Sequence, residues 1–172
     1  MGATITESKS ADAVTLGLGV LGIAAWPPGS PAVWTDVGYI KSMTATYSRE
    51  LKEFESGGIL VKRLAFRDRF MFDADWAEVS ITNLQKVIAG DEGANDHKFG
   101  GSREINRYAL RFEHLRDDLK YVTVDLYKAV AGGEFKLAFA EEDFIVYPTN
   151  WSAERDTTKA AGQQYGRITI AT

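Results

Sequence analysis

A glycine motif is the first feature of this sequence whose residue types and spacing could do chemistry. Gly17, Gly19 and Gly22 match the pattern G-x-G-x-x-G, which binds a pyrophosphate when a helix begins at its end. Here Trp26-Pro27-Pro28 follows instead, and no alternation of strands and helices continues from the motif. A glycine-rich strand is therefore the interpretation that the sequence favours, with nucleotide binding as the alternative.

Carboxylates and histidines are the other candidates for chemistry. Asp73, Asp75 and Glu78 resemble part of a calcium loop, but the glycine of its sharp turn and the glutamate at its twelfth position are missing. We expect these carboxylates on a solvated strand face and just before a helix. His97 and His114 have no second ligand at metal-binding spacing. The sequence thus predicts no catalytic, cofactor or metal site.

Composition narrows the classes of protein further. The chain has 172 residues, 45% of them hydrophobic and 26% charged, which is typical of one globular domain. It contains no cysteine, which excludes disulfide scaffolds and thiolate metal sites. A net charge of −4 disfavours sequence-independent nucleic-acid binding. The longest apolar stretch, residues 13–26, is too short to cross a bilayer as a helix, so we expect no membrane span.

Alternation of apolar and polar residues in the first half predicts strands. After a flexible N-terminal arm (residues 1–12), an extended segment (13–25) and an ordered loop (26–31), Tyr39 to Ser48 alternate as one strand. Residues 49–56 are charged, and we expect a loop there. From Leu64 to Trp76 the alternation continues beyond a usual strand length, so we expect a hairpin that turns near Arg67-Asp68.

The spacing of apolar residues then changes from every second residue to every third or fourth, which predicts one α-helix over about residues 80–89. Ser80 is its expected N-cap and Gly90 its expected C′ residue. Its apolar face would consist of Ile81, Leu84, Val87 and Ile88. Residues 91–102 are polar and glycine-rich, and we expect a surface loop. The histidine in this segment, His97, would lie in that loop.

The second half returns to a period of two residues. Residues 107–114 and 121–127 predict a hairpin. A Gly132-Gly133 turn then leads into an apolar alternation over residues 135–139, a further strand over 144–147, a polar loop with Trp151, and a closing strand with Ile168 and Ile170. About seven strands and one helix result. The predicted fold is mainly β, an antiparallel sandwich or barrel with one flanking helix and long loops, in a single domain over residues 1–172.

The order of these segments resembles that of the tail tube (major tail) proteins of long-tailed bacteriophages. The similarity runs from about Ala13 onward and concerns most of the chain. It is carried by the strand Asp36-Val-Gly-Tyr-Ile-Lys, the acidic loop of residues 50–58, the helix Ile81-Thr-Asn-Leu-Gln-Lys-Val-Ile-Ala-Gly and the closing segment through Glu142-Asp143-Phe144.

This resemblance implies a virion protein without a cofactor, assembled in the host bacterial cytoplasm. It implies stacked, hexameric rings that form the tail tube, through which DNA passes into the host without specific binding. The partners would be further copies of the chain and other tail proteins: tape measure, tail terminator and distal tail. Carried over to this chain, the resemblance places inter-subunit contacts at the N-terminal arm and at four apolar side chains, Leu51, Phe54, Ile168 and Ile170.

Three alternatives stay open from the sequence. The inner tube of a contractile tail or injection system has a related fold and would give the same signals. A β-barrel that binds a small ligand would explain the aromatic residues, which make up 12% of the chain. An enzyme with a dispersed site would need distant residues to meet in a polar cleft.

Overall fold

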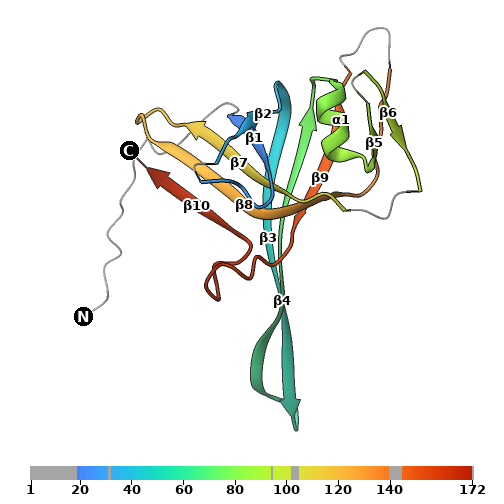
Figure 1. The fold of residues 1–172 in the computed structure, drawn as a ribbon. Helices are drawn as coiled ribbons and strands as arrows, with labels where there is room; N and C mark the ends of the chain where they lie inside the picture. The colour runs from blue at the N-terminus through green and yellow to red at the C-terminus, as the bar shows by residue number, and fades with distance from the viewer. Residues whose placement is uncertain (1–18, 31, 94, 102–104, 140–144, 172) are drawn as a thin grey trace.

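A computed structural model describes residues 19–30, 32–93, 95–101, 105–139 and 145–171 of the chain (Figure 1). The described part is mainly β, as predicted, with one α-helix. Its elements are β1 (Val20–Ala25), β2 (Thr35–Asp36), β3 (Ile40–Ser56), β4 (Ile59–Trp76), α1 (Ile81–Val87), β5 (Gly90–Glu92), β6 (His97–Phe99), β7 (Tyr108–Leu115), β8 (Tyr121–Gly132), β9 (Tyr147–Ala153) and β10 (Gly166–Ala171).

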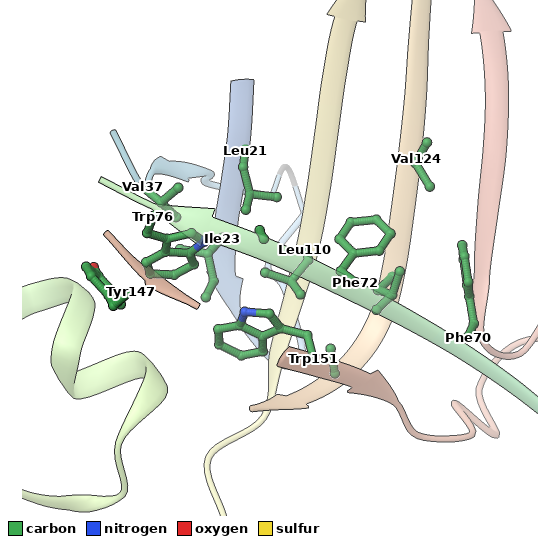
Figure 2. Packing of buried hydrophobic residues seen from close by; sticks show 13 residues of the cluster. Leu21, Ile23, Val37, Phe70, Phe72, Trp76, Leu110, Val124, Tyr147 and Trp151 are labelled. Carbon is green, nitrogen blue, oxygen red and sulfur yellow. The ribbon is translucent and has the colours of Figure 1, made fainter. Parts of the chain in front are cut away.

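One antiparallel sheet of eight strands dominates the molecule, and it is not closed into a barrel. Its order is β2-β1-β7-β8-β9-β4-β3, and β10 pairs with β8 off this path. Strand β8 is the branch point, because its first half pairs with β10 and its second half with β9, both on the edge away from β7. The sheet therefore divides at β8, and β4 and β9 cross over β1, β7 and β8 as a second layer (Figure 2).

The core lies between these two layers and is filled by aromatic side chains. Strand β4 alternates so that Phe70, Phe72, Ala74 and Trp76 point inward and are buried. Trp76 stacks on Trp151 of β9 at a centroid distance of 6.1 Å (Figure 2). Each such fully buried large apolar side chain contributes about 1.5–3 kcal/mol to stability. This packed interior leaves no support for the small-ligand barrel, which needs an empty one.

The helix begins where the sequence predicted and ends earlier. Its N-cap is Ser80, whose Oγ accepts a hydrogen bond from the backbone N–H of Asn83 at 3.2 Å. The C-cap is Ile88, whereas Gly90, predicted as the C′ residue, is the first residue of β5. The predicted loop over residues 91–102 is also wrong in part, because β5 and β6 pair there as a small separate sheet.

The largest difference from the predicted fold concerns β3 and β4. They pair from Ile40 and Trp76 to Ser56 and Ile59, with register shifts after Ile40, Glu50 and Phe54, and the chain turns at Gly57-Gly58, where both φ values are positive. The segment predicted as a loop, residues 49–56, is thus part of β3. The turn predicted near Arg67-Asp68 is also wrong, since both residues lie within β4 and pair with β3.

In the second half of the chain the hairpin of β7 and β8 and the closing strand β10 are confirmed. The predicted strand over residues 135–139 is not formed, and residues 134–139 are irregular. The next strand, β9, begins at Tyr147 instead of ending there, and Trp151 belongs to it instead of to a loop. Thr149 and Pro148 are responsible, because Thr149 is a buried polar residue between the fully buried Tyr147 and Trp151, and a proline is uncommon within a strand.

Some predictions concern residues outside the described ranges. These are the flexible N-terminal arm of residues 1–12, the first part of the extended segment of residues 13–25, and the start of the strand predicted over residues 144–147. The last part of that extended segment, residues 20–25, forms β1. Trp26-Pro27-Pro28 continues from it as an ordered loop, as predicted.

Tyr147 makes the free energy of unfolding depend on pH in the alkaline range. Its ring is fully buried, its hydroxyl donates to the Glu78 carbonyl at 2.9 Å, and burial raises its pKa to about 12. The unfolded chain deprotonates this tyrosine at a pKa of about 10. The folded state therefore keeps its proton longer, and the free energy of unfolding falls between pH 10 and pH 12, by about 2–3 kcal/mol at about 1.36 kcal/mol per pKa unit.

We expect Tyr147→Phe to lose about 1 kcal/mol of stability at pH 8.5, since it lacks the hydrogen bond to Glu78. The variant should then lose less stability than the wild type between pH 8.5 and pH 11.5, because it has no buried phenol to ionise. Urea unfolding at the two pH values measures both effects. An equal loss in the two proteins would contradict the account of Tyr147.

Candidate assembly site: the protruding hairpin and the groove at its base

The glycines and carboxylates first considered for chemistry have structural roles. Gly22 lies in β1 and Gly19 directly precedes it, so a strand and not a helix begins here. A Cβ added at Gly19 would lie only 2.0 Å from the Glu113 carbonyl oxygen. The carboxylate of Asp75 accepts a hydrogen bond from the hydroxyl of Ser42 at 2.7 Å, and that of Asp73 accepts one from Asn150. Close packing and strand-to-strand hydrogen bonds thus account for these groups.

The histidines lie apart from each other. His97 is on β6, not in a loop, with one ring nitrogen 2.8 Å from the Ile88 carbonyl oxygen. His114 is buried on β7. Within the described ranges, no three histidine, aspartate or glutamate side chains are grouped so that they could hold a metal ion. The same ranges contain no helix long and apolar enough to cross a membrane.

The outer halves of β3 and β4 extend away from the body of the molecule (Figure 1). We call residues 49–68 the protruding hairpin. Residues 59–67 are all exposed, whereas from Phe70 inward every second residue of β4 enters the core. At about 3.3 Å per residue, the eight residues from Arg49 to Ser56 reach about 26 Å. One pair of strands is therefore anchored at one end and free at the other.

Charged side chains hold the two strands of the protruding hairpin together. Arg49 forms an ion pair with Asp68 at 2.7 Å, and Arg63 forms one with Glu53 at 2.5 Å. The hydrogen bond from Arg49 keeps the pKa of Asp68 below its usual value. Exposed pairs of this kind contribute little to stability, because solvent screens them. They favour one register, while the buried inner half supplies the stability that an isolated two-stranded hairpin lacks.

Apolar side chains on the protruding hairpin face solvent. Seven have exposed fractions between 40% and 70%: Leu51, Phe54, Ile59, Leu60, Val61, Leu64 and Phe66. Soluble monomers rarely expose so many large apolar groups together, and such surfaces are typical of contacts with other proteins. The edge of β3 away from β4 is also unpaired along its 17 residues in the described part of the chain. A strand edge of this length can pair with a strand of another chain.

A groove of about 550 Å³ lies between the base of the protruding hairpin and β10. The two walls meet at Gly166, which has no space for a side chain: a Cβ there would lie 2.3 Å from the Asp125 carbonyl oxygen and 2.5 Å from the ring of Phe70. From this contact β4 and β10 separate. The groove is lined by Tyr47, Arg49, Ala65, Phe66, Arg67, Asp68, Phe70, Arg155, Ala161, Gly162, Gln164, Tyr165, Gly166, Arg167 and Ile168.

Asp125 fixes the β10 wall of this groove. It is 4% exposed on β8 and lies directly opposite Arg111 of β7 and Arg167 of β10. Its two carboxylate oxygens accept hydrogen bonds from Arg111 at 2.7 Å and from Arg167 at 2.9 Å. The bond to Asp125 raises the pKa of Arg111. One buried carboxylate thereby connects three neighbouring strands and holds β10 in register.

The four side chains predicted as contact residues all face solvent. Leu51 and Phe54 lie on the protruding hairpin, 52% and 63% exposed, and Ile168 and Ile170 lie on β10, 65% and 58% exposed. The fold does not bring the two pairs together within one chain, since β10 points away from the tip (Figure 1).

Sequence reasoning overlooked the apolar residues after the Gly57-Gly58 turn, namely Ile59, Leu60 and Val61, and it overlooked Phe66 as a surface residue. The run Ile-Leu-Val directly after two glycines was the available signal. No local sequence pattern indicated the groove, because residues far apart in the sequence form it.

No family model and no curated protein matches this sequence. Among solved structures, the fold is similar to a chain in the cryo-EM structure of the anti-feeding prophage (AFP) baseplate, 6-fold symmetrised. The TM-score is 0.44, the sequence identity is 12%, and the match covers 97% of each chain.

The role of Asp125 can be tested by substitution. We expect Asp125→Ala to lower the free energy of unfolding by about 2–3 kcal/mol, somewhat less than for a fully buried ion pair because both arginines are partly exposed. Backbone amides of β10 should exchange with deuterium faster in this variant, while those of β1 keep their rates. Asp117→Ala, in an exposed turn, is the matched control. Unchanged exchange of β10 in Asp125→Ala would refute the role given to this carboxylate.

Proposed function

We propose that this chain is a structural subunit that assembles with further copies of itself through the protruding hairpin. The observation that carries this proposal is the hairpin: a strand pair anchored in the core whose outer half presents large apolar side chains to solvent. Burial of such side chains in a neighbouring subunit would remove their unfavourable contact with water, at about 25 cal/mol per Å² of apolar surface.

Free strand edges give the subunit further means of assembly. Strand β3 has one unpaired edge, and β10 pairs only with β8 among the described strands. Monomeric β proteins usually protect long edges, because an open edge pairs with other chains. A closed ring of subunits uses these edges instead of protecting them, since every edge then meets a partner. Leu51, Phe54, Ile168 and Ile170 would all lie at contacts between subunits.

The finer form of the proposal is the tail tube of a long-tailed bacteriophage. Hexameric rings would stack into a tube that conducts DNA into the host, and the tape measure, tail terminator and distal tail proteins would be its partners in the virion. The order of strands, acidic segment and helix in the sequence supports this form. The net charge of −4 supports it too, because an acidic lumen would repel the phosphate backbone of passing DNA.

Assembly of the purified protein tests the proposal. The wild type is expected to form rings or tubes in negative-stain micrographs and oligomers in mass photometry as its concentration rises. Leu51→Lys/Phe54→Lys should remain monomeric, because a charge buried at a contact without a partner costs several kcal/mol. Phe99→Lys is the matched control, since Phe99 is 73% exposed on β6, away from the protruding hairpin. A wild type that stays monomeric at every concentration would refute the proposal.

A further inference from the structure

We infer that the groove between the protruding hairpin and β10 is the acceptor site for the tip of the protruding hairpin of a second copy of this chain. This inference rests on the proposed self-assembly and adds to it the two surfaces that meet. The tip is residues 53–61, which include the Gly57-Gly58 turn. The contact is heterologous, because the tip of one subunit meets a different surface, the groove, of the next.

The groove is basic although the chain as a whole is acidic. Its lining has four arginines, Arg49, Arg67, Arg155 and Arg167, and one carboxylate, that of Asp68. Arg49 is paired with Asp68, and Arg167 is paired with the buried Asp125 of β8.

The other two arginines have no carboxylate partner among the described residues. Arg155 donates to the amide oxygen of Gln164, and Arg67 lies beside the ring of Phe66 at 5.6 Å. Two unneutralised positive charges therefore border a groove that also has aromatic walls, and this combination fits an acidic segment with apolar side chains.

The tip has the complementary chemistry. Residues 53–61 contain two glutamates and neither lysine nor arginine. Glu53 is paired with Arg63, whereas Glu55 forms no ion pair with any residue that the structure describes. Phe54, Ile59, Leu60 and Val61 are exposed by 63%, 70%, 40% and 59%. One free carboxylate surrounded by apolar side chains thus matches the basic, aromatic groove.

The occupant has to come from another molecule. The tip and the base of the protruding hairpin are the two ends of one hydrogen-bonded strand pair, so the tip cannot fold back to the groove at its own base. The second edge of β4 over residues 59–70 has no strand neighbour in the described part of the chain, since β9 pairs with β4 only from Met71 onward. An inserted strand could therefore also form backbone hydrogen bonds with β4.

The absence of cysteine from the chain permits a direct test by disulfide formation between copies. Ser56→Cys places a thiol at the tip, and Ala161→Cys places one at the exposed rim of the groove. The two single variants are mixed at a concentration at which the wild type assembles, oxidised mildly, and analysed by mass spectrometry of the linked peptides. We expect a link between positions 56 and 161. The matched control replaces Ala161→Cys by Thr82→Cys, which is exposed on α1.

The outcomes separate this inference from the proposed function. Assembly with a link between 56 and 161, and less of the link between 56 and 82, supports the inference. Assembly in which 56 links no better to 161 than to 82 overturns it and leaves self-assembly standing, with the tip bound at another surface. A wild type that does not assemble overturns the proposed function, and the inference with it.

A charge exchange provides the second measurement. Arg155→Glu is expected to raise the concentration of half-assembly by at least about tenfold, because it places like charges at the contact with Glu55. Adding Glu55→Arg to the same chain should restore most of the lost assembly. Lys136→Glu, an equal change of charge at an exposed residue outside the groove, is the control. A double variant that assembles no better than Arg155→Glu overturns the pairing of Glu55 with Arg155.

Discussion

The pairing of β3 with β4 along their whole length is the constraint on which the rest of the structure depends. Its inner half contributes Phe70, Phe72, Ala74 and Trp76 to the core. Its outer half has no core to enter, and backbone hydrogen bonds and exposed ion pairs such as Arg49–Asp68 hold its two strands together. A two-stranded hairpin in water is marginally stable by itself. The buried aromatic residues of β4 therefore determine whether the protruding hairpin exists as a defined surface.

The groove depends on the same strands and on two local features. Strand β8 pairs with β10 along its first half and with β9 along its second. Strand β10 therefore lies outside the strand order that runs from β8 through β9 to β4. Gly166 then allows β10 to begin against the ring of Phe70, where a side chain would collide. Asp125 holds β10 at that position through Arg167. An anchored hairpin and a groove at its base thus follow from one sheet that divides at a single strand.

The sequence predicted those elements that have one buried and one solvated face. Strands β7 and β8 and the inner half of β4 alternate clearly, and Ser80 marks the start of α1. Strand β10 was also predicted from its alternation, although its Ile168 and Ile170 face solvent. The outer half of β3 could not be recognised in this way, because solvent lies on both of its faces and its charged residues show no period. Strand β9 was hidden by the polar residues and the proline between Tyr147 and Trp151. The exposed Leu51 and Phe54 could be chosen from sequence, whereas the groove combines Phe70 with Gly166, a contact that only the folded chain creates.

The central claim is that the protruding hairpin is free in the single subunit and buried in the assembly. Hydrogen–deuterium exchange of the wild type at low and high protein concentration tests this claim most directly. Amides of residues 49–67 that point to the unpaired edges should exchange rapidly at low concentration and become protected as oligomers form, while the amides of β7 and β8 keep their rates. Exchange in the protruding hairpin that stays equally fast at both concentrations, although oligomers form, would contradict the account.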